Sequence, residues 1–217
     1  MQIKSQRLPG YSLRRSLMIW AVLLAVPVIL VPASVRPQSA LPPNCLGGTL
    51  DAPIRMDVFS DFQCPACRTF YLETVTQVLK SYATNDKICI IYHEFPLAMH
   101  PYGREAARYS LAAQRLGRKQ WAAVVDALYT KQPIWSLDGK LDAIVMGAVS
   151  PEDFAKIKKA LQEPSIEQAI AQDIALGQKK EVKSTPTIFV TALNKQQKVE
   201  GPLEYPVWKN FFDGIVK

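Results

Sequence analysis

The sequence predicts an α/β fold in which a βαβ unit, a long helical insertion and a ββα unit follow one another. Two apolar, strand-like runs at residues 54–62 and 88–95 enclose a segment with helical periodicity. This order within about forty residues predicts parallel strands joined by a right-handed crossover. Residues 98–180 contain no strand-like stretch, whereas β-branched residues return at 187–191. A helical subdomain is therefore expected to interrupt the α/β part at about 98–180.

The first helix should begin directly after the strand at 54–62. Pro65 is tolerated in a first helical turn, because its missing N–H would have no partner there. An apolar stripe at helical spacing then runs from Tyr71 to Tyr82, and Asn85-Asp86 ends the pattern before the second strand. The two strands and this helix make up the expected βαβ unit.

Helix and turn signals place the remaining elements. Gly117 is a suitable C′ residue for the first inserted helix, and capping boxes begin at Ser150 and Ser165. Asn194-Lys195 marks a turn between two antiparallel strands, and Gly201-Pro202 precedes the last helix. The expected elements are helices at 104–116, 120–130, 154–161 and 166–176, strands at 187–191 and 197–200, and a helix at about 206–216.

Composition excludes several classes of protein. The chain has 217 residues, with 48% hydrophobic and 21% charged, which are values of a globular domain rather than of a disordered or fibrous chain. The net charge is +7, but four of the basic residues lie in the first fifteen positions and leave 22 basic against 19 acidic residues elsewhere. This excess is too small to predict a nucleic-acid partner.

The N-terminus has the pattern of an export segment. Lys4, Arg7, Arg14 and Arg15 precede an apolar run at 17–31, in the order of a signal peptide. Extended to Val35, the run is almost long enough to be a membrane anchor instead. Either alternative leaves the rest of the chain outside the cytoplasm. We therefore expect a signal peptide or anchor at 1–35, a proline-rich linker at 36–44 and one folded domain at 45–217.

The pair Cys64 and Cys67 carries the main chemical signal. Cysteines spaced i, i+3 at the start of a helix have Cβ atoms roughly 5 to 6 Å apart, so that a disulfide between them can open and close. Unpaired N–H groups at the helix N-terminus stabilise a Cys64 thiolate, and the pKa values of such thiols fall to about 3.5 to 7.5. Cys67, one turn further, is expected to be the buried, resolving cysteine.

The pair allows two other interpretations. A zinc site would need Cys64 and Cys67 to be completed by His93 and His100, whose spacing does not match the usual ligand pattern. A purely structural disulfide would close so small a loop that it would restrain the unfolded chain little. Both are less favoured than a redox-active pair.

Several segments resemble the DsbA-like thiol:disulfide oxidoreductases, across about residues 45–217. They are Ala52-Pro53, residues 59–67, residues 95–97 with His100-Pro101, and residues 184–187. The resemblance implies a thioredoxin-like fold with a helical insert and Cys64 as the attacking cysteine. It also implies that Pro186 is a cis-proline beside Cys64, and that Thr185 offers backbone groups to an extended client strand.

Two positions depart from this family's pattern. The family often has a buried glutamate where this chain has Val58, and Asp57 points to the opposite face of the strand. Asp61 is expected to be a solvated loop or cap residue. Cys67 should therefore exchange its proton without a neighbouring buried carboxylate. Strong oxidants of the family often have histidine where this chain has Ala66, so Pro65 and Ala66 leave the thiolate with one stabilising partner fewer.

Cys45 and Cys89 lie outside the motif. Cys89 alternates with isoleucines in a strand and could be a small buried hydrophobe, but two unpaired thiols are unusual in an oxidising compartment. A bridge is feasible if Cys45 begins an edge strand beside residues 88–95. His93, Glu94, His100 and the tryptophans are expected to be packing or surface residues.

The predicted function is that of an exported thiol:disulfide oxidoreductase acting on reduced or misoxidised exported proteins, without a metal or organic cofactor. The resemblance implies re-oxidation by a DsbB- or VKOR-type membrane partner. Membrane contact is expected only through the N-terminal segment, if that segment is retained. The alternatives are a reductase or isomerase of the same fold, and a non-enzymatic metal- or peptide-binding module.

Overall fold

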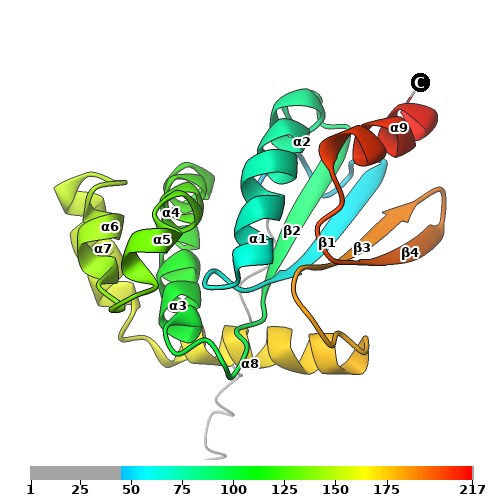
Figure 1. Cartoon of the computed structure of the whole chain (residues 1–217). Helices are drawn as coiled ribbons and strands as arrows, with labels where there is room; N and C mark the ends of the chain where they lie inside the picture. Colours follow the sequence, from blue (N-terminus) through cyan, green and yellow to red (C-terminus); the bar gives the residue numbers. More distant parts are fainter. Residues whose placement is uncertain (1–44, 217) are drawn as a thin grey trace, which may run out of the picture. The chain divides into compact units, whose positions relative to one another are not determined.

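The computed structural model describes residues 45–216 and contains a four-stranded sheet. The strand order is β2-β1-β3-β4 (Figure 1). β1 pairs with β2 in parallel, while β3 is antiparallel to both β1 and β4. The expected thioredoxin-like order, βαβ and then ββα, is therefore confirmed. The strands are β1 (Ile54–Ser60), β2 (Ile88–Glu94), β3 (Thr187–Ala192) and β4 (Lys195–Glu200).

The N-terminal segment 1–35 and the linker 36–44 expected from the sequence lie outside the described residues. In the part of the chain that is described, no helix combines the length and the apolar character needed to cross a membrane.

A helix follows the cysteine pair and packs on one face of the sheet. It runs through α1 (Pro65–Phe70), a π-helical turn η1 (Tyr71–Val75) and α2 (Thr76–Ser81), and the short 3₁₀ turn η2 (Ala83–Asn85) follows it. Helical backbone angles continue through both junctions. The apolar stripe predicted this helix, but it did not indicate the π turn.

The insertion is helical throughout, as predicted. It contains two helices that the sequence analysis did not anticipate, α5 and α6, because four to six residues are too few to show a periodic pattern. The inserted helices are α3 (Gly103–Gln114), α4 (Arg118–Thr130), α5 (Gln132–Trp135), α6 (Leu141–Met146), α7 (Pro151–Ala160) and α8 (Pro164–Lys179).

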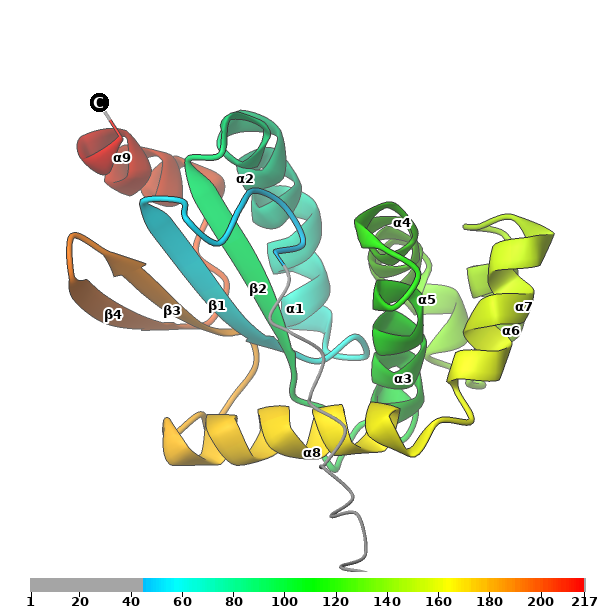
Figure 2. The ribbon, with the colours of Figure 1, turned by 180° about the vertical axis from the view of Figure 1, so that it is seen from behind.

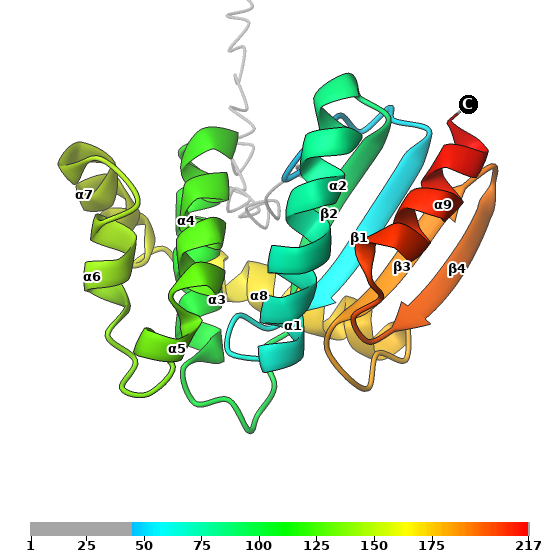
Figure 3. The ribbon, with the colours of Figure 1, turned by 45° about the horizontal axis from the view of Figure 1, so that its top comes forward.

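Helices cover both faces of the sheet (Figure 3). The chain from α1 to α2 lies on one face together with α9 (Tyr205–Ile215), and α8 lies on the other. Figure 2 shows α8 running from the inserted helices back to the sheet. Alternate side chains of β1 and β2 accordingly enter two different interiors: Val58 and Tyr92 join the main core, whereas Phe59 packs with Val182 and Phe189.

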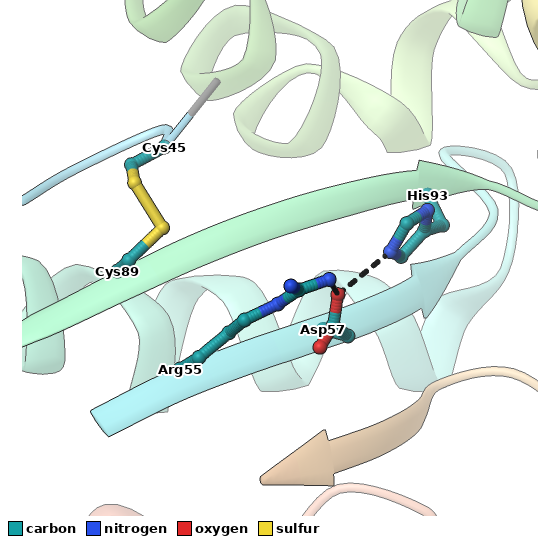
Figure 4. The surroundings of a disulfide bond; sticks show 5 residues. All are labelled: Cys45, Arg55, Asp57, Cys89 and His93. Atoms are coloured by element: carbon teal, nitrogen blue, oxygen red, sulfur yellow. Dashed lines mark hydrogen bonds and ion pairs between the residues drawn. A yellow bond between two sulfur atoms is a disulfide. The ribbon is translucent and has the colours of Figure 1, made fainter. Parts of the chain in front are cut away.

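The segment before β1 covers the outer edge of β2. Leu46 N donates to Ile90 O at 2.7 Å, and Ile90 N donates to Gly47 O at 3.2 Å. This is an isolated antiparallel bridge, not the edge strand that the sequence analysis considered as a condition for a disulfide. A disulfide joins Cys45 to Cys89 (Figure 4), so the bond considered from the sequence is present.

Candidate active site

Cys64 and Cys67 lie where β1 ends and α1 begins. Cys64 is the N-cap residue with extended backbone angles, and Pro65 opens the helix. Both motif cysteines are free thiols in this structure. Cys64 is 7% exposed and Cys67 only 1%. Cys64 is thus the more accessible of the two sulfur atoms, and Cys67 lies one helical turn deeper.

The two thiols have opposite acidities. The pKa of Cys64 is lowered to about 5, first by a hydrogen bond from Cys67. Burial opposes this effect, while the backbone N–H groups of Cys67 and Ala66 add to it. Burial, followed by the hydrogen bond to Cys64 and the charge of Cys64, raises the pKa of Cys67 well above its ordinary value. Cys64 therefore ionises at neutral pH while Cys67 keeps its proton.

The loop before β3 meets Cys64 across the site. The Thr185–Pro186 peptide bond is cis. The Cys64 thiol donates to Thr185 O at 3.4 Å. The Thr185 hydroxyl is buried, and among the described residues it has no hydrogen-bond partner. The structure thus places Thr185 and Pro186 beside the cysteine pair, although the two segments are far apart in the sequence.

Asp61 is not the solvated residue expected from the sequence. It is 1% exposed, and its carboxylate accepts from Gln63 N at 2.8 Å, Leu97 N at 2.8 Å and His100 Nδ1 at 2.7 Å. Its own N–H donates to Cys67 Sγ at 3.5 Å. Of the three contacts of the carboxylate, only the one with Gln63 is local in sequence. The other two join the loop after β1 to the segment after β2, and no local sequence pattern indicates them.

A glutamine from the insertion donates hydrogen bonds to the backbone around Cys64. Gln132, at the start of α5, is buried and donates to Phe62 O at 2.6 Å and to Cys64 O at 3.0 Å. Gln63 reaches back and donates to Ser136 O at 3.2 Å. The inserted helices therefore fix the backbone at Cys64 as well as covering the sheet. Sequence reasoning missed Gln132, which stands in no recognisable motif.

A buried carboxyl ends β2, the strand that pairs in parallel with the strand carrying Val58. Glu94, the last residue of β2, is 2% exposed, and burial raises its pKa well above the ordinary range. It pairs in register with Ser60, whose hydroxyl lies 2.7 Å from Tyr129 Oη. The Ser60 hydroxyl also contributes to lowering the pKa of Cys67.

His93 lies on the opposite face of the sheet, as part of a buried ionic group. Its Nε2 is 3.0 Å from Asp57 Oδ1, and its Nδ1 is 2.8 Å from Asp173 Oδ1 on α8. Arg55 also contacts Asp57, at 2.5 Å (Figure 4). His93 and His100 are thus bound to carboxylates. Within residues 45–216, no group of three or more His, Cys, Asp or Glu side chains could hold a metal ion.

These features define a thiol:disulfide oxidoreductase with a thioredoxin-like fold and a helical insert. The Thioredoxin family model matches residues 42–213, and the chain belongs to this family. Within it, the chain is DsbA-like.

Two curated proteins illustrate the similarity in sequence. The probable disulfide bond formation protein D of Bacillus cereus is 25% identical over 151 residues, which cover 66% of this chain and 68% of that protein. Disulfide bond formation protein D of Bacillus subtilis is 26% identical over 152 residues, covering 66% and 65%.

Solved structures share the fold at low sequence identity. Wolbachia pipientis α-DsbA1 superimposes with a TM-score of 0.67 at 21% identity, over 81% of this chain and 92% of that chain. Oxidised BdbD from Bacillus subtilis gives a TM-score of 0.63 at 21% identity, over 77% and 89%.

Proposed function

We propose that this enzyme is exported and passes a disulfide between Cys64 and Cys67 to reduced or misoxidised exported proteins. The observation that carries the proposal is the asymmetry of the pair. Cys64 is the more exposed sulfur and its pKa is lowered to about 5, whereas the buried Cys67 has a raised pKa. A thiolate stabilised in this way favours the reduced form of the pair, which makes the disulfide oxidising.

The exchange proceeds in two displacement steps. A client thiolate attacks Cys64 Sγ, a client–Cys64 disulfide forms, and the Cys64–Cys67 bond breaks with its electron pair passing to Cys67, which then takes up a proton. A second client thiolate attacks the client sulfur of this mixed disulfide, and Cys64 leaves as a thiolate. The client loses two electrons and two thiol protons, and the cysteine pair becomes a dithiol.

The residues beside Cys64 support a binding site for the client chain. Thr185 O lies 3.4 Å from Cys64 Sγ, and the buried Thr185 hydroxyl has no partner among residues 45–216. We assign Thr185 and Pro186 to binding an extended client segment through backbone hydrogen bonds. Pro65 and Ala66 tune the thiolate, because they form the first helical turn, whose N–H groups face Cys64.

The proposed direction of electron transfer and the proposed export of the enzyme rest on different observations. The two Bacillus relatives are named for disulfide bond formation, which supports net oxidation over reduction or isomerisation. The basic residues and apolar run at the N-terminus support export. Repeated turnover then requires re-oxidation of the dithiol, for which we propose a membrane protein of the DsbB or VKOR type.

Trapping experiments test the proposed roles. In Cys67→Ser, the Cys64 thiolate should attack the disulfides of misoxidised clients, and the mixed disulfides should accumulate on a non-reducing gel because Cys67 is not there to displace the client. Cys64→Ser should give neither adducts nor turnover. Adducts in Cys64→Ser alone would reverse the two roles. A reduction potential near −120 mV would support an oxidant, and one near −270 mV a reductant, by the DsbA and thioredoxin reference values.

A further inference from the structure

Gln132 brings a side-chain amide of the insertion to the backbone on both sides of Gln63. Its Nε2 donates to Phe62 O at 2.6 Å and to Cys64 O at 3.0 Å. Both partners are carbonyl oxygens, which only accept hydrogen bonds, so the nitrogen rather than the oxygen of the amide has to face them. The two N–H groups of one amide are thus used on the two carbonyls that flank Gln63.

The carbonyl of Cys64 is the one hydrogen-bonding group of the peptide bond that opens α1. Pro65 contributes the nitrogen of that bond and has no N–H, so the plane of the peptide can be held only through its oxygen. Cys64 O accepts from Arg68 N at 3.1 Å, and its second lone pair accepts from Gln132. Gln132 therefore restrains the rotation that relates Cys64, the N-cap residue, to the first turn of the helix.

The carbonyl of Phe62 depends on Gln132 still more. Phe62 lies between the end of β1 and Cys64, and its side chain is 1% exposed. In the turns and loops of residues 45–216, no backbone N–H donates to Phe62 O. Loss of the Gln132 amide would leave this buried carbonyl without a donor or make the loop move to find one.

Gln132 is itself held by the folded insertion. It is 5% exposed at the start of α5, and its own carbonyl accepts from Ser136 N at 3.0 Å. Trp135 of the same helix is fully buried, and its Nε1 donates to Leu128 O of α4 at 2.7 Å. Gln63 donates in return to Ser136 O at 3.2 Å. The amide therefore projects from a packed corner of the insertion, and hydrogen bonds run in both directions between this corner and the loop that carries Gln63.

The first turn of α1 stabilises a Cys64 thiolate only while its donors point toward the sulfur atom. These donors are the Cys67 thiol and the N–H groups of Cys67 and Ala66. Hydrogen bonds weaken steeply as their angle departs from linearity, so a rotation at Cys64 would reduce the stabilisation. In the oxidised protein no thiolate is present, and the bond between Cys64 and Cys67 itself fixes the sulfur. The contacts of Gln132 should therefore matter most in the reduced protein.

We propose that Gln132 is a positioning residue for the reactive cysteine: by holding Phe62 O and Cys64 O, it keeps the first turn of α1 directed at Cys64 Sγ in the dithiol form. It acts through the backbone of Cys64 rather than on a reacting sulfur atom. The helical insertion then sets the oxidising strength of the cysteine pair through one side chain, in addition to covering the sheet. The inference deepens the proposed function and rests on it.

Gln132→Met tests this role, because methionine has a similar length but no N–H group. Thiolate absorbance titration should show the pKa of Cys64 raised by about one unit, which corresponds to about 1.36 kcal/mol and to the net loss of one hydrogen bond. At neutral pH, the equilibrium constant with which the disulfide oxidises glutathione should fall about tenfold, a decrease of about 30 mV in the reduction potential.

Gln120→Met is the matched control. It removes another amide of the insertion, whose Nε2 donates to Asp153 Oδ2 at 3.1 Å on the far side of α4 from no part of the motif loop. It should keep the wild-type pKa of Cys64 and the wild-type equilibrium constant.

Denaturant unfolding of both redox forms separates positioning from a structural role. A structural role alone would destabilise the oxidised and the reduced protein equally, and would change neither the pKa of Cys64 nor the equilibrium with glutathione. Positioning predicts that Gln132→Met loses more stability in the reduced form, by the same factor of about ten in the unfolding equilibrium constant at neutral pH.

Gln132→Asn keeps the amide on a side chain one methylene shorter, and it should shift both quantities in the same direction by less. It decides by the same measurements if Gln132→Met does not fold. Wild-type values of the pKa and the equilibrium constant in the folded variant, or an equal shift in Gln120→Met, overturn the inference. A wild-type protein that titrates as described but does not oxidise reduced clients would instead overturn the proposed function.

Discussion

His93 Nε2 lies 3.0 Å from Asp57 Oδ1, on the face of the sheet that α8 covers. The same imidazole contacts Asp173 of α8 through Nδ1. Burial alone would lower the pKa of His93, but the carboxylates of Asp173 and Asp57 outweigh burial and raise it. Burial likewise opposes ionisation of Asp57, and His93 with Arg55 nevertheless keeps its pKa low. One imidazole therefore links β1, β2 and α8.

This arrangement predicts that stability depends on pH through His93. Because its pKa is raised on folding, His93 contributes stability in full below its unfolded pKa of about 6.5, and this contribution is lost as pH rises through the folded value. Urea unfolding of wild type should therefore show a free energy that falls from about pH 6 toward pH 9. His93→Gln should be less stable by about 3 kcal/mol at pH 6, as expected for a broken buried ion pair.

The difference between wild type and His93→Gln should shrink as pH rises, because the neutral imidazole no longer compensates the two carboxylates. Asp57 gives the free energy of unfolding the opposite pH dependence, at acidic pH. Its pKa is lowered, so its contribution is present above about pH 3.9 and disappears as pH falls through the folded value. Equal slopes for the two proteins above pH 6 would show that His93 is not charged in the folded state.

Local patterns in the sequence were enough to predict the sheet and the cysteine pair. Alternation in β1 and β2 and the placement of Cys64 between strand and helix depend on neighbouring residues. Asp61 and Gln132 were missed because most of their contacts depend on how the insertion folds back. The pairing of Ser60 with Glu94 depends on the parallel register of two strands, which no local pattern specifies. From the sequence, Glu94 was therefore expected only to be a packing or surface residue.

Removing the disulfide between Cys45 and Cys89 should affect stability without affecting exchange. The bond spans 44 residues in sequence, and the loop-entropy relation gives about 4 kcal/mol for such a loop. Cys89 pairs with Arg55 near the start of β1, whereas Cys64 follows the end of that strand. Cys45→Ala with Cys89→Ala should therefore lower the free energy of unfolding by up to this amount and leave the rate of glutathione exchange unchanged.

Alanine is the suitable replacement because both sulfur atoms lie in a small buried apolar cluster with Ile91, where a serine hydroxyl would need a partner. Denaturant unfolding of the double variant and wild type, each with Cys64 and Cys67 oxidised, isolates the effect of the outer bond. If the folded double variant exchanges with glutathione more slowly than wild type, the bond also positions the active site. An unchanged unfolding free energy would mean that the bridge does not restrain the chain.

Ala66→His should make the cysteine pair more oxidising. Ala66 lies in the first turn of α1, and its N–H already contributes to lowering the pKa of Cys64 to about 5. An imidazole at this position adds a hydrogen-bond donor or a positive charge beside the thiolate. Each further pKa unit stabilises the reduced form by about 1.36 kcal/mol at neutral pH, which corresponds to a rise of about 30 mV in the reduction potential.

Thiolate absorbance titration gives the pKa of Cys64 in each protein, and equilibration with glutathione gives the potential. Ala66→Gln is the matched control, because it adds a polar side chain of similar size that cannot become charged. The potential should rise in Ala66→His by the amount that the pKa decrease requires, and by less in Ala66→Gln. A lower pKa with an unchanged potential would require the imidazole to stabilise the disulfide form equally. An unchanged pKa would show that residue 66 acts on Cys64 only through its backbone N–H.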